Sequence, residues 1–376
     1  MYILPKGNTS KGFCNTLTMK GEFFMHETNK HKGNVLVIHG GGLVEPSKLV
    51  LMRISQNLST LTHFDTVYIG QFSFESLYSR KYIKKYNMDL VNEVKDKRGT
   101  YFGTSRGIDL ATNSLLFKKS VDCLSSMNIS TLIVAGGDGS SRQVTEIHEL
   151  FKEYGINVIF PIPLTIDGIN GGLSIGLNEA VRESVRQIEN ISSTSLQTRD
   201  QEKFGVVIVE LHGRNRDDIL ANVLKHFVNK KQVADFNLND LTLAVVPATI
   251  KTDPEKLFDK VNNSSKRTLI LISEGAEVSI PELKKGINRK VRSLVVGHPS
   301  QSNNMTTSSD IIFYNDWIDN ACKIIADDPF KSYCVVNNGI TLCKRSISYY
   351  ADLNPRNGQK VQLPEDSDLL IRSFMS

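Results

Sequence analysis

Two aspartates lie in glycine-bearing turns that each follow a short apolar run. Asp138 belongs to AGGDGSS at 135–141, and Asp167 belongs to PLTIDGINGG at 163–172. The run TLIVA at 131–135 is typical of a buried strand, so Asp138 stands where a strand ends in bare glycine and a helix begins. Backbone amides and a positive helix end then face one point, which suits a phosphate chain. The two segments together predict a site for phosphoryl transfer.

The two aspartates have different chemical roles in this interpretation. Asp138 would hold a magnesium ion against the phosphates, because oxygen ligands are what Mg²⁺ prefers. The run INVIF at 156–160 is typical of another buried strand, which puts Thr165 and Asp167 at the carboxyl end of a sheet. An aspartate at that position can accept the proton of an attacking hydroxyl.

The elements that must position these residues alternate between strands and helices. After the first turn, Val144, Ile147 and Phe151 recur at helical spacing, and Gly155 supplies a stop. The segment at 310–325 predicts a later helix of the first domain. We therefore expect an α/β protein with two Rossmann-like, three-layer domains around separate cores and a cleft between the domains. The expected parts are an N-terminal extension (1–34), a donor domain (35–178, completed by 299–345), an acceptor domain (179–298) and a C-terminal tail (346–376).

These residues resemble the phosphofructokinase family, which carries a GGDGS turn and a Pro-x-Thr-Ile-Asp segment on the next strand. VLVIHGGG at 35–42 is similar to the opening strand of the family, and RGTYFGTSRG at 98–107 is similar to its Gly-Thr-x-x-Gly-Ser-x-Arg segment. VVIVELHGR at 206–214 is similar to the strand that ends in Glu-Val-Met-Gly-Arg. The other matching segments are at 175–195, 269–276 and 291–298. The likeness covers about residues 35–345.

The resemblance implies a role for each matching residue. On the donor side it implies contacts from Gly41, Arg106, Gly137, Asp138, Gly139 and Ser140, with Asp138 beside the metal. It implies Asp167 as the catalytic base, with Thr165, Arg214 and Arg106 as the other catalytic residues. On the acceptor side it implies Thr165, Asp167, His212, Gly213, Arg214, Glu274, Arg292 and His298.

The donor that the family pattern favours is ATP with Mg²⁺. Gly139 follows Asp138 directly, and Leu164 stands where the pattern of pyrophosphate-dependent members has a lysine. Gln143 argues against ATP, because it replaces the small residue that usually opens space for adenine. Pyrophosphate is therefore the less expected donor.

The acceptor side departs from the family pattern at five positions. Gly168 and Ile169 replace the Asn-Asp pair that usually follows the catalytic aspartate. Gln301 and Gly205 stand where the family has arginines that grip the sugar phosphate, and His212 replaces a methionine. Each lost charge-assisted contact is worth about 1.5–3 kcal/mol. Fructose 6-phosphate is the acceptor by resemblance, whereas the chemistry favours an unphosphorylated sugar or a compound whose charge lies elsewhere.

Two other classes of protein are open alternatives. NAD and lipid kinases share a GGDG turn, but those folds are not expected to carry Thr165, Asp167 and Arg214 together. A regulator that binds nucleotide or metabolite without turnover would explain the missing arginines. It would have no physical need for both a base and cations at the transition state, which Asp167, Arg106 and Arg214 supply.

Composition excludes several further classes. The chain has 376 residues, 40% of them hydrophobic and 23% charged, which is ordinary for a globular enzyme. The net charge of +5 is spread along the chain with no zinc or RNA-binding pattern, so we expect no nucleic-acid partner. No apolar run is long enough to cross a membrane, and five cysteines at irregular spacing indicate a reducing, cytoplasmic location. The family implies a homodimer or homotetramer whose acceptor sites are completed across subunits.

Overall fold

The first sheet forms one lobe with helices on both faces. The computed structural model describes residues 33–169, 173–196, 204–337, 341–353 and 360–375. The sheet has seven strands in the order β13-β12-β5-β4-β1-β2-β3. The parallel strands are β1 (Gly33–Gly40), β2 (Phe64–Gly70), β4 (Ile129–Gly136), β5 (Asn157–Phe160) and β12 (Tyr333–Asn337). The antiparallel edges are β3 (Ile83–Lys85) and β13 (Leu342–Arg345).

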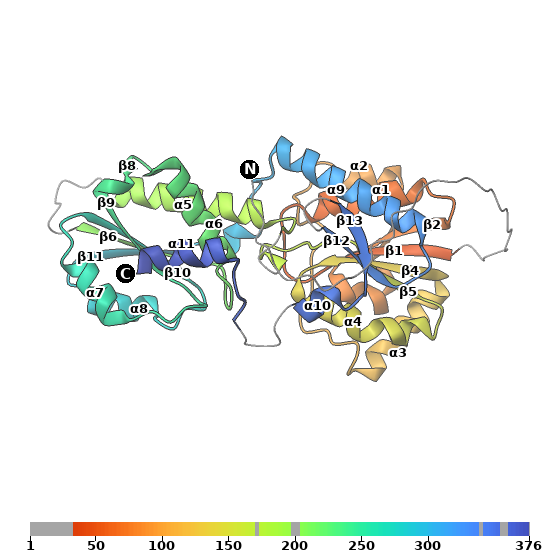
Figure 1. The fold of residues 1–376 in the computed structure, drawn as a ribbon. Coiled ribbons are helices and arrows are strands. Elements are labelled where there is room, and N and C mark those ends of the chain that lie inside the picture. Colours follow the sequence, from red (N-terminus) through yellow and green to blue (C-terminus); the bar gives the residue numbers. More distant parts are fainter. Residues whose placement is uncertain (1–32, 170–172, 197–203, 338–340, 354–359, 376) are drawn as a thin grey trace. The chain divides into compact units, whose positions relative to one another are not determined.

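Alternate residues of β1 face the two helical layers of this lobe. Val35 and Val37 pack on the face of α1 (Ser47–Ser59), α2 (Met88–Val94) and α9 (Ser308–Asp327). Leu36 and Ile38 pack on the face of α3 (Ser114–Ser126), α4 (Asp138–Lys152) and α10 (Tyr349–Leu353). Helices α1 and α9 lie side by side (Figure 1). Because both faces are covered, the central strands are continuous apolar runs.

The second sheet is smaller and wholly parallel, in the order β11-β6-β10-β9. Its strands are β6 (Phe204–Leu211), β9 (Leu241–Val246), β10 (Arg267–Ser273) and β11 (Lys290–Val295). One face carries α5 (Leu177–Leu196), α6 (Asp218–Lys230) and α11 (Glu365–Met375), and the other carries α7 (Pro254–Asn262) and α8 (Ile280–Gly286). Short elements complete the described chain: β7 (Gln232–Val233), β8 (Phe236–Asn237), η1 (Ser73–Tyr78), η2 (Arg80–Tyr82), η4 (Leu238–Asp240) and η5 (His298–Ser300).

Two three-layer α/β lobes confirm the predicted fold class, but the cores are not separate. One buried cluster includes Val37 of the first sheet, Ala180 and Val185 of α5, and Val207 and Val209 of the second sheet. The cluster is continuous because helix α5 packs along β6, while its first turn contacts α9 of the first lobe. None of the helices in the described ranges is both long and apolar enough to cross a membrane.

The two ends of the chain differ from the expectation of an extension and a tail. Residues 1–32 of the predicted extension lie outside the described residues, whereas Gly33 and Asn34 already belong to β1. The predicted tail contains α10, which packs on α4, and α11, which packs on α6 and β9. Ile371 of α11 is fully buried. The tail segment therefore contributes a helix to each lobe.

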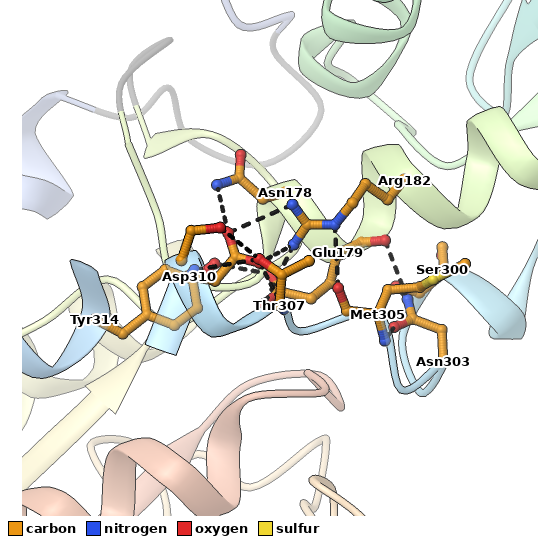
Figure 2. Close-up of polar contacts among 10 residues, drawn as sticks. Asn178, Glu179, Arg182, Ser300, Asn303, Met305, Thr307, Asp310 and Tyr314 are labelled. Carbon is orange, nitrogen blue, oxygen red and sulfur yellow. Dashed lines mark hydrogen bonds and ion pairs between the residues drawn. The ribbon is translucent and has the colours of Figure 1, made fainter. Parts of the chain in front are cut away.

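Polar side chains join α5 to α9 where the chain crosses back to the first lobe (Figure 2). The hydroxyl of Tyr314 donates to Oε2 of the buried Glu179 at 2.9 Å. Arg182 forms an ion pair with Asp310, and Nδ2 of Asn303 donates to the carbonyl of Glu179 at 3.2 Å. These contacts fix the start of α5 against the start of α9.

Candidate phosphoryl-transfer site

Three parallel strands bring their carboxyl ends together at the predicted donor turns. β1, β4 and β5 are neighbours, so the turns after Gly40, Gly136 and Phe160 meet at one edge of the sheet. The side chain of Ser140 lies between the first two strands. A Cβ at Gly40 or Gly136 would lie 2.3 or 2.6 Å from its Oγ, so only glycine fits at either position. This buries the hydroxyl of Ser140, so its predicted donor contact could come only from the backbone.

A pocket of about 410 Å³ collects most of the predicted site residues. It is lined from the first lobe by Gly42, Leu43, Val44, Arg106, Thr165, Ile166 and Asp167, and from the later segments by His212, Gly213, Arg214, Glu274, His298 and Gln301. Asp167 and the predicted acceptor residues thus face the same space. Arg292 is the exception, because it is exposed on the edge strand β11 and does not line this pocket.

The acceptor corner of the pocket is built around Glu274, at the end of β10. Nδ1 of His212 lies 3.1 Å from Oε2 of Glu274, and Nε of Arg214 lies 3.3 Å from Oε1. Burial disfavours the charged form of Glu274, but the contacts from His212 and Arg214 outweigh it and lower its pKa. A Cβ at Gly275 would lie 1.4 Å from the carbonyl oxygen of Arg214, so this close approach requires glycine. The result is an ionised carboxylate held on both oxygens.

Asp167 is the titratable group best suited to proton transfer. Burial raises its pKa to about 6, against the opposing charge of Arg216. Its backbone is fixed, because Oγ of Ser174 donates to the carbonyl of Asp167 at 2.6 Å and Oγ1 of Thr165 accepts from its amide at 3.2 Å. A carboxylate with this pKa is ionised at neutral pH and can still take up a proton.

Arg216 belongs to the site although the sequence analysis did not select it. Its Nη1 donates to Oδ2 of Asp138 at 2.6 Å, and its Nε donates to Oδ2 of Asp218 at 2.8 Å. The side chain is only 7% exposed. Its position two residues beyond Arg214 was the only available sequence signal, because its partner Asp138 lies 78 residues away.

The donor set around Asp138 does not fit a metal ion held by the protein alone. Oδ2 of Asp138 is occupied by Arg216, and Oδ1 is buried without a hydrogen-bond partner among the described residues. Ile169, where the family pattern has a second carboxylate, is buried in the core. Within the described ranges, no group of three or more His, Cys, Asp and Glu residues is placed to hold a metal. The predicted magnesium contact is thus reduced to one free oxygen atom.

Two of the departures in sequence have clear structural consequences. Gln301 lines the pocket, so an uncharged amide stands where the family pattern has an arginine. A Cβ at Gly205 would lie 2.3 Å from Nη2 of Arg289, so a longer side chain there would have to displace this guanidinium. Arg289 itself donates to Oγ1 of Thr268 at 3.0 Å and to the carbonyl of Lys266 at 2.9 Å. Arg289 therefore stabilises the fold and does not supply the positive charge that the family pattern has at position 205.

The donor side is closed by contacts between the first turn and the loop at 103–110. Oγ1 of Thr104 donates to the carbonyl of Gly41, and Arg106 lies over Gly42 on the pocket wall. Nε2 of Gln143 donates to the carbonyl of Ile108 at 2.9 Å. The side chain of Gln143 is thus held by the same loop.

The fold and site define a class: a two-lobed α/β protein in which one aspartate, two arginines and a glycine turn line one pocket, as in kinases that phosphorylate an alcohol. The sequence model of the family described as Phosphofructokinase matches residues 34–316. The chain belongs to the phosphofructokinase family.

The comparisons with individual proteins agree with this assignment. The chain is 29% identical over 241 residues to the ATP-dependent 6-phosphofructokinase of Mannheimia succiniciproducens, over 62% of this chain and 67% of that protein. It is 24% identical over 318 residues to the protein of the same name from Sulfurimonas denitrificans, over 82% of this chain and 90% of that protein.

Solved structures share the fold. Pichia pastoris phosphofructokinase in the T-state matches with a TM-score of 0.67 and 17% identity, over 89% of this chain but only 39% of that longer chain. The pyrophosphate-dependent phosphofructokinase from Marinobacter aquaeolei matches with a TM-score of 0.68 and 14% identity, over 92% of both chains. At these identities the likeness speaks for the fold alone.

Proposed function

We propose that the protein transfers the terminal phosphoryl group of ATP, supplied as its magnesium complex, to a hydroxyl of a sugar or sugar phosphate. The observation that carries the proposal is the placement of Asp167, with a pKa of about 6, in one pocket with Arg106, Arg214 and Glu274. Phosphoryl transfer needs positioning and cations more than covalent help. A base and two arginines on one pocket wall meet that need.

Each residue has a defined part in this mechanism. Glu274, held by His212 and Arg214, orients the acceptor through its hydroxyl groups. Asp167 takes the proton of the attacking hydroxyl as the bond to phosphorus forms. Arg106 on the donor side and Arg214 on the acceptor side stabilise the charge on the transferred group. Mg²⁺ is part of the donor substrate and offsets the charge of its phosphates.

The names of the relatives and the charges of the pocket favour different acceptors. The relatives from Mannheimia and Sulfurimonas are named 6-phosphofructokinases, which favours fructose 6-phosphate. Gln301 and Gly205 carry no charge, and Arg292 does not line the pocket. A sugar phosphate would therefore bind weakly in a single subunit. We propose that unphosphorylated sugars compete as acceptors.

Association of several subunits is one way to place another positive charge in the acceptor site. Arg292 is exposed on β11, at the edge of the second sheet, where another subunit can approach it. We propose a homodimer or homotetramer in which Arg292 serves the acceptor site of a neighbour. Light scattering would give the oligomeric state. Oligomers mixed from Arg292→Ala and Asp167→Asn subunits should regain activity, because one kind of subunit supplies Asp167 and the other supplies Arg292 to the same site.

ATP is proposed over pyrophosphate as the donor. The curated relatives are named ATP-dependent, and Gly139 and Leu164 agree with that choice. Fold neighbours from Marinobacter aquaeolei and Nitrosospira multiformis are named pyrophosphate-dependent, so both donors belong in the test.

The deciding experiment is phosphorus NMR with magnesium on the purified protein. ATP, GTP and pyrophosphate are each offered with fructose 6-phosphate and with a panel of unphosphorylated sugars. A new phosphoester that requires one acceptor, and that Asp167→Asn abolishes, would establish the kinase and name its substrate. Donor binding without product from any pair would favour a regulator, the second candidate that the uncharged Gln301 and Gly205 support.

A further inference from the structure

Arg216 is a buried cation among three aspartates that come from separate parts of the chain. It bonds directly to Asp138 of α4 and to Asp218 of α6. Its charge also acts on Asp167, beside the turn after β5, whose ionised form it favours. Charges this deeply buried are normally paired, and removal of one partner leaves a costly unpaired charge. The guanidinium is therefore the main counter-ion of the acidic group, and the charge of Arg142 also acts on Asp138.

The loop that carries Arg216 is anchored at its next residue. Asp217 is fully buried and accepts hydrogen bonds from the amides of Ala248 and Thr249 at 2.8 and 2.9 Å. It also accepts from Oγ of Ser273 at 2.6 Å. Because the backbone next to Arg216 is fixed, little conformational entropy is lost in holding its side chain against Asp138 and Asp218. Arg216 is a permanent part of the site.

A guanidinium and a divalent cation compete for the same carboxylate. Oδ2 of Asp138 is taken by Arg216, and a metal at the remaining oxygen would stand close to a fixed positive charge in a partly buried place. The nearby carboxylate of Asp218 is also occupied by Arg216, and the apolar Ile169 offers no further ligand. The positive charge of Arg216 and the occupied carboxylate of Asp218 both disfavour a metal ion held by the protein at this position.

We propose that the Arg216 guanidinium takes the place of a protein-bound metal beside Asp138, so that the protein holds no divalent cation of its own and Mg²⁺ enters only with the donor phosphates. Arg216 is then a positioning residue, which orients Asp138 and neutralises the acidic group before substrate arrives. The inference concerns the site of the proposed function. Its test needs no acceptor, so its failure would leave the phosphotransfer proposal standing.

The test measures Mn²⁺ binding by electron paramagnetic resonance on the full chain without nucleotide. The wild type is compared with Arg216→Met, Arg216→Lys, Asp138→Asn and the double variant Arg216→Met with Asp138→Asn. Arg53→Met is the matched control, because Arg53 also pairs with a carboxylate, that of Asp319 at 2.6 Å, away from the site. Circular dichroism checks that each variant is folded.

We expect no stoichiometric Mn²⁺ site in the wild type, Arg216→Lys or Arg53→Met. Arg216→Met should bind one Mn²⁺ at least about tenfold more tightly than the wild type, because the carboxylates of Asp138 and Asp218 lose the guanidinium that occupies them. The double variant should lose this site. One Mn²⁺ per wild-type chain that Asp138→Asn removes would overturn the proposal, as would a folded Arg216→Met that binds no better than the wild type. If Arg216→Met does not fold, the wild-type and Asp138→Asn measurements still decide.

Discussion

His212 and Glu274 are 62 residues apart in sequence, yet Nδ1 of His212 lies 3.1 Å from Oε2 of Glu274. The contact joins the ends of β6 and β10, which are neighbours in the second sheet. Arg214 holds the other oxygen of the same carboxylate. An acceptor would thus meet a carboxylate whose orientation is already fixed, which reduces the entropy lost on binding.

Glu274→Gln should weaken acceptor binding without changing donor binding. A hydrogen bond to a charged group is worth about 1.5–3 kcal/mol, so the KM for the acceptor should rise about 10- to 150-fold. Initial rates with each substrate varied in turn would measure this. Glu277→Gln is the control, because Glu277 is 54% exposed and pairs with Lys360. An equal rise in both KM values would contradict the assignment of Glu274 to the acceptor.

Asp167→Asn should remove the general base and leave the donor site intact. General bases contribute about 10²- to 10⁴-fold to rates, so kcat should fall by that factor. Titration calorimetry with the magnesium complex of ATP should show a dissociation constant close to that of the wild type. A kcat within tenfold of the wild type would exclude Asp167 as the base.

The pH profile of kcat/KM should report the ionisation of Asp167. A base must be deprotonated to act, and burial raises the pKa of Asp167 to about 6, so activity should be full above this pH and fall as the pH drops through it. Arg216 favours the ionised form. In Arg216→Met the acidic limb should therefore move to higher pH, whereas Arg53→Met should leave it in place. A midpoint near that of a free aspartate would contradict this role.

Gln301→Arg should increase the preference for a phosphorylated acceptor. Gln301 lines the pocket, so a guanidinium there can reach a phosphate that the wild-type amide cannot neutralise. The specificity constant for fructose 6-phosphate should rise at least about tenfold relative to that for unphosphorylated fructose. Gln301→Met, of similar length without charge, should show no such rise. Equal changes for both sugars would place the acceptor phosphate elsewhere.

Tyr314→Phe should destabilise the fold by about 1–3 kcal/mol, because the buried Oε2 of Glu179 loses its donor. Urea unfolding followed by circular dichroism would measure the free energy of unfolding. Tyr154→Phe is the control, since Tyr154 is 54% exposed, and should stay within about 0.5 kcal/mol of the wild type. Equal values for both variants would mean that water or another residue satisfies Glu179.

Local patterns were sufficient for the central elements. The runs at 131–135 and 206–210 are apolar throughout because strands of a parallel sheet are buried on both faces, and both proved to be strands, β4 and β6. The glycine turns after β4 and β5 placed Asp138 and Asp167 at the carboxyl edge of the first sheet, because parallel strands end at the same edge. α11 was missed although Ser367, Ile371 and Phe374 follow helical spacing, because the short segment follows turn residues and its packing partner α6 lies far away in sequence.

The sequence by itself determined the α/β class, the order of the strands along the chain and the type of chemistry, because each depends on periodicity and on residues within one turn of each other. Only the tertiary structure decided which charges meet. It paired Arg216 with Asp138, joined His212 to Glu274 and left Arg292 off the pocket wall. Such contacts depend on how distant loops fold back and on the direction of each side chain, and neither is encoded in local spacing.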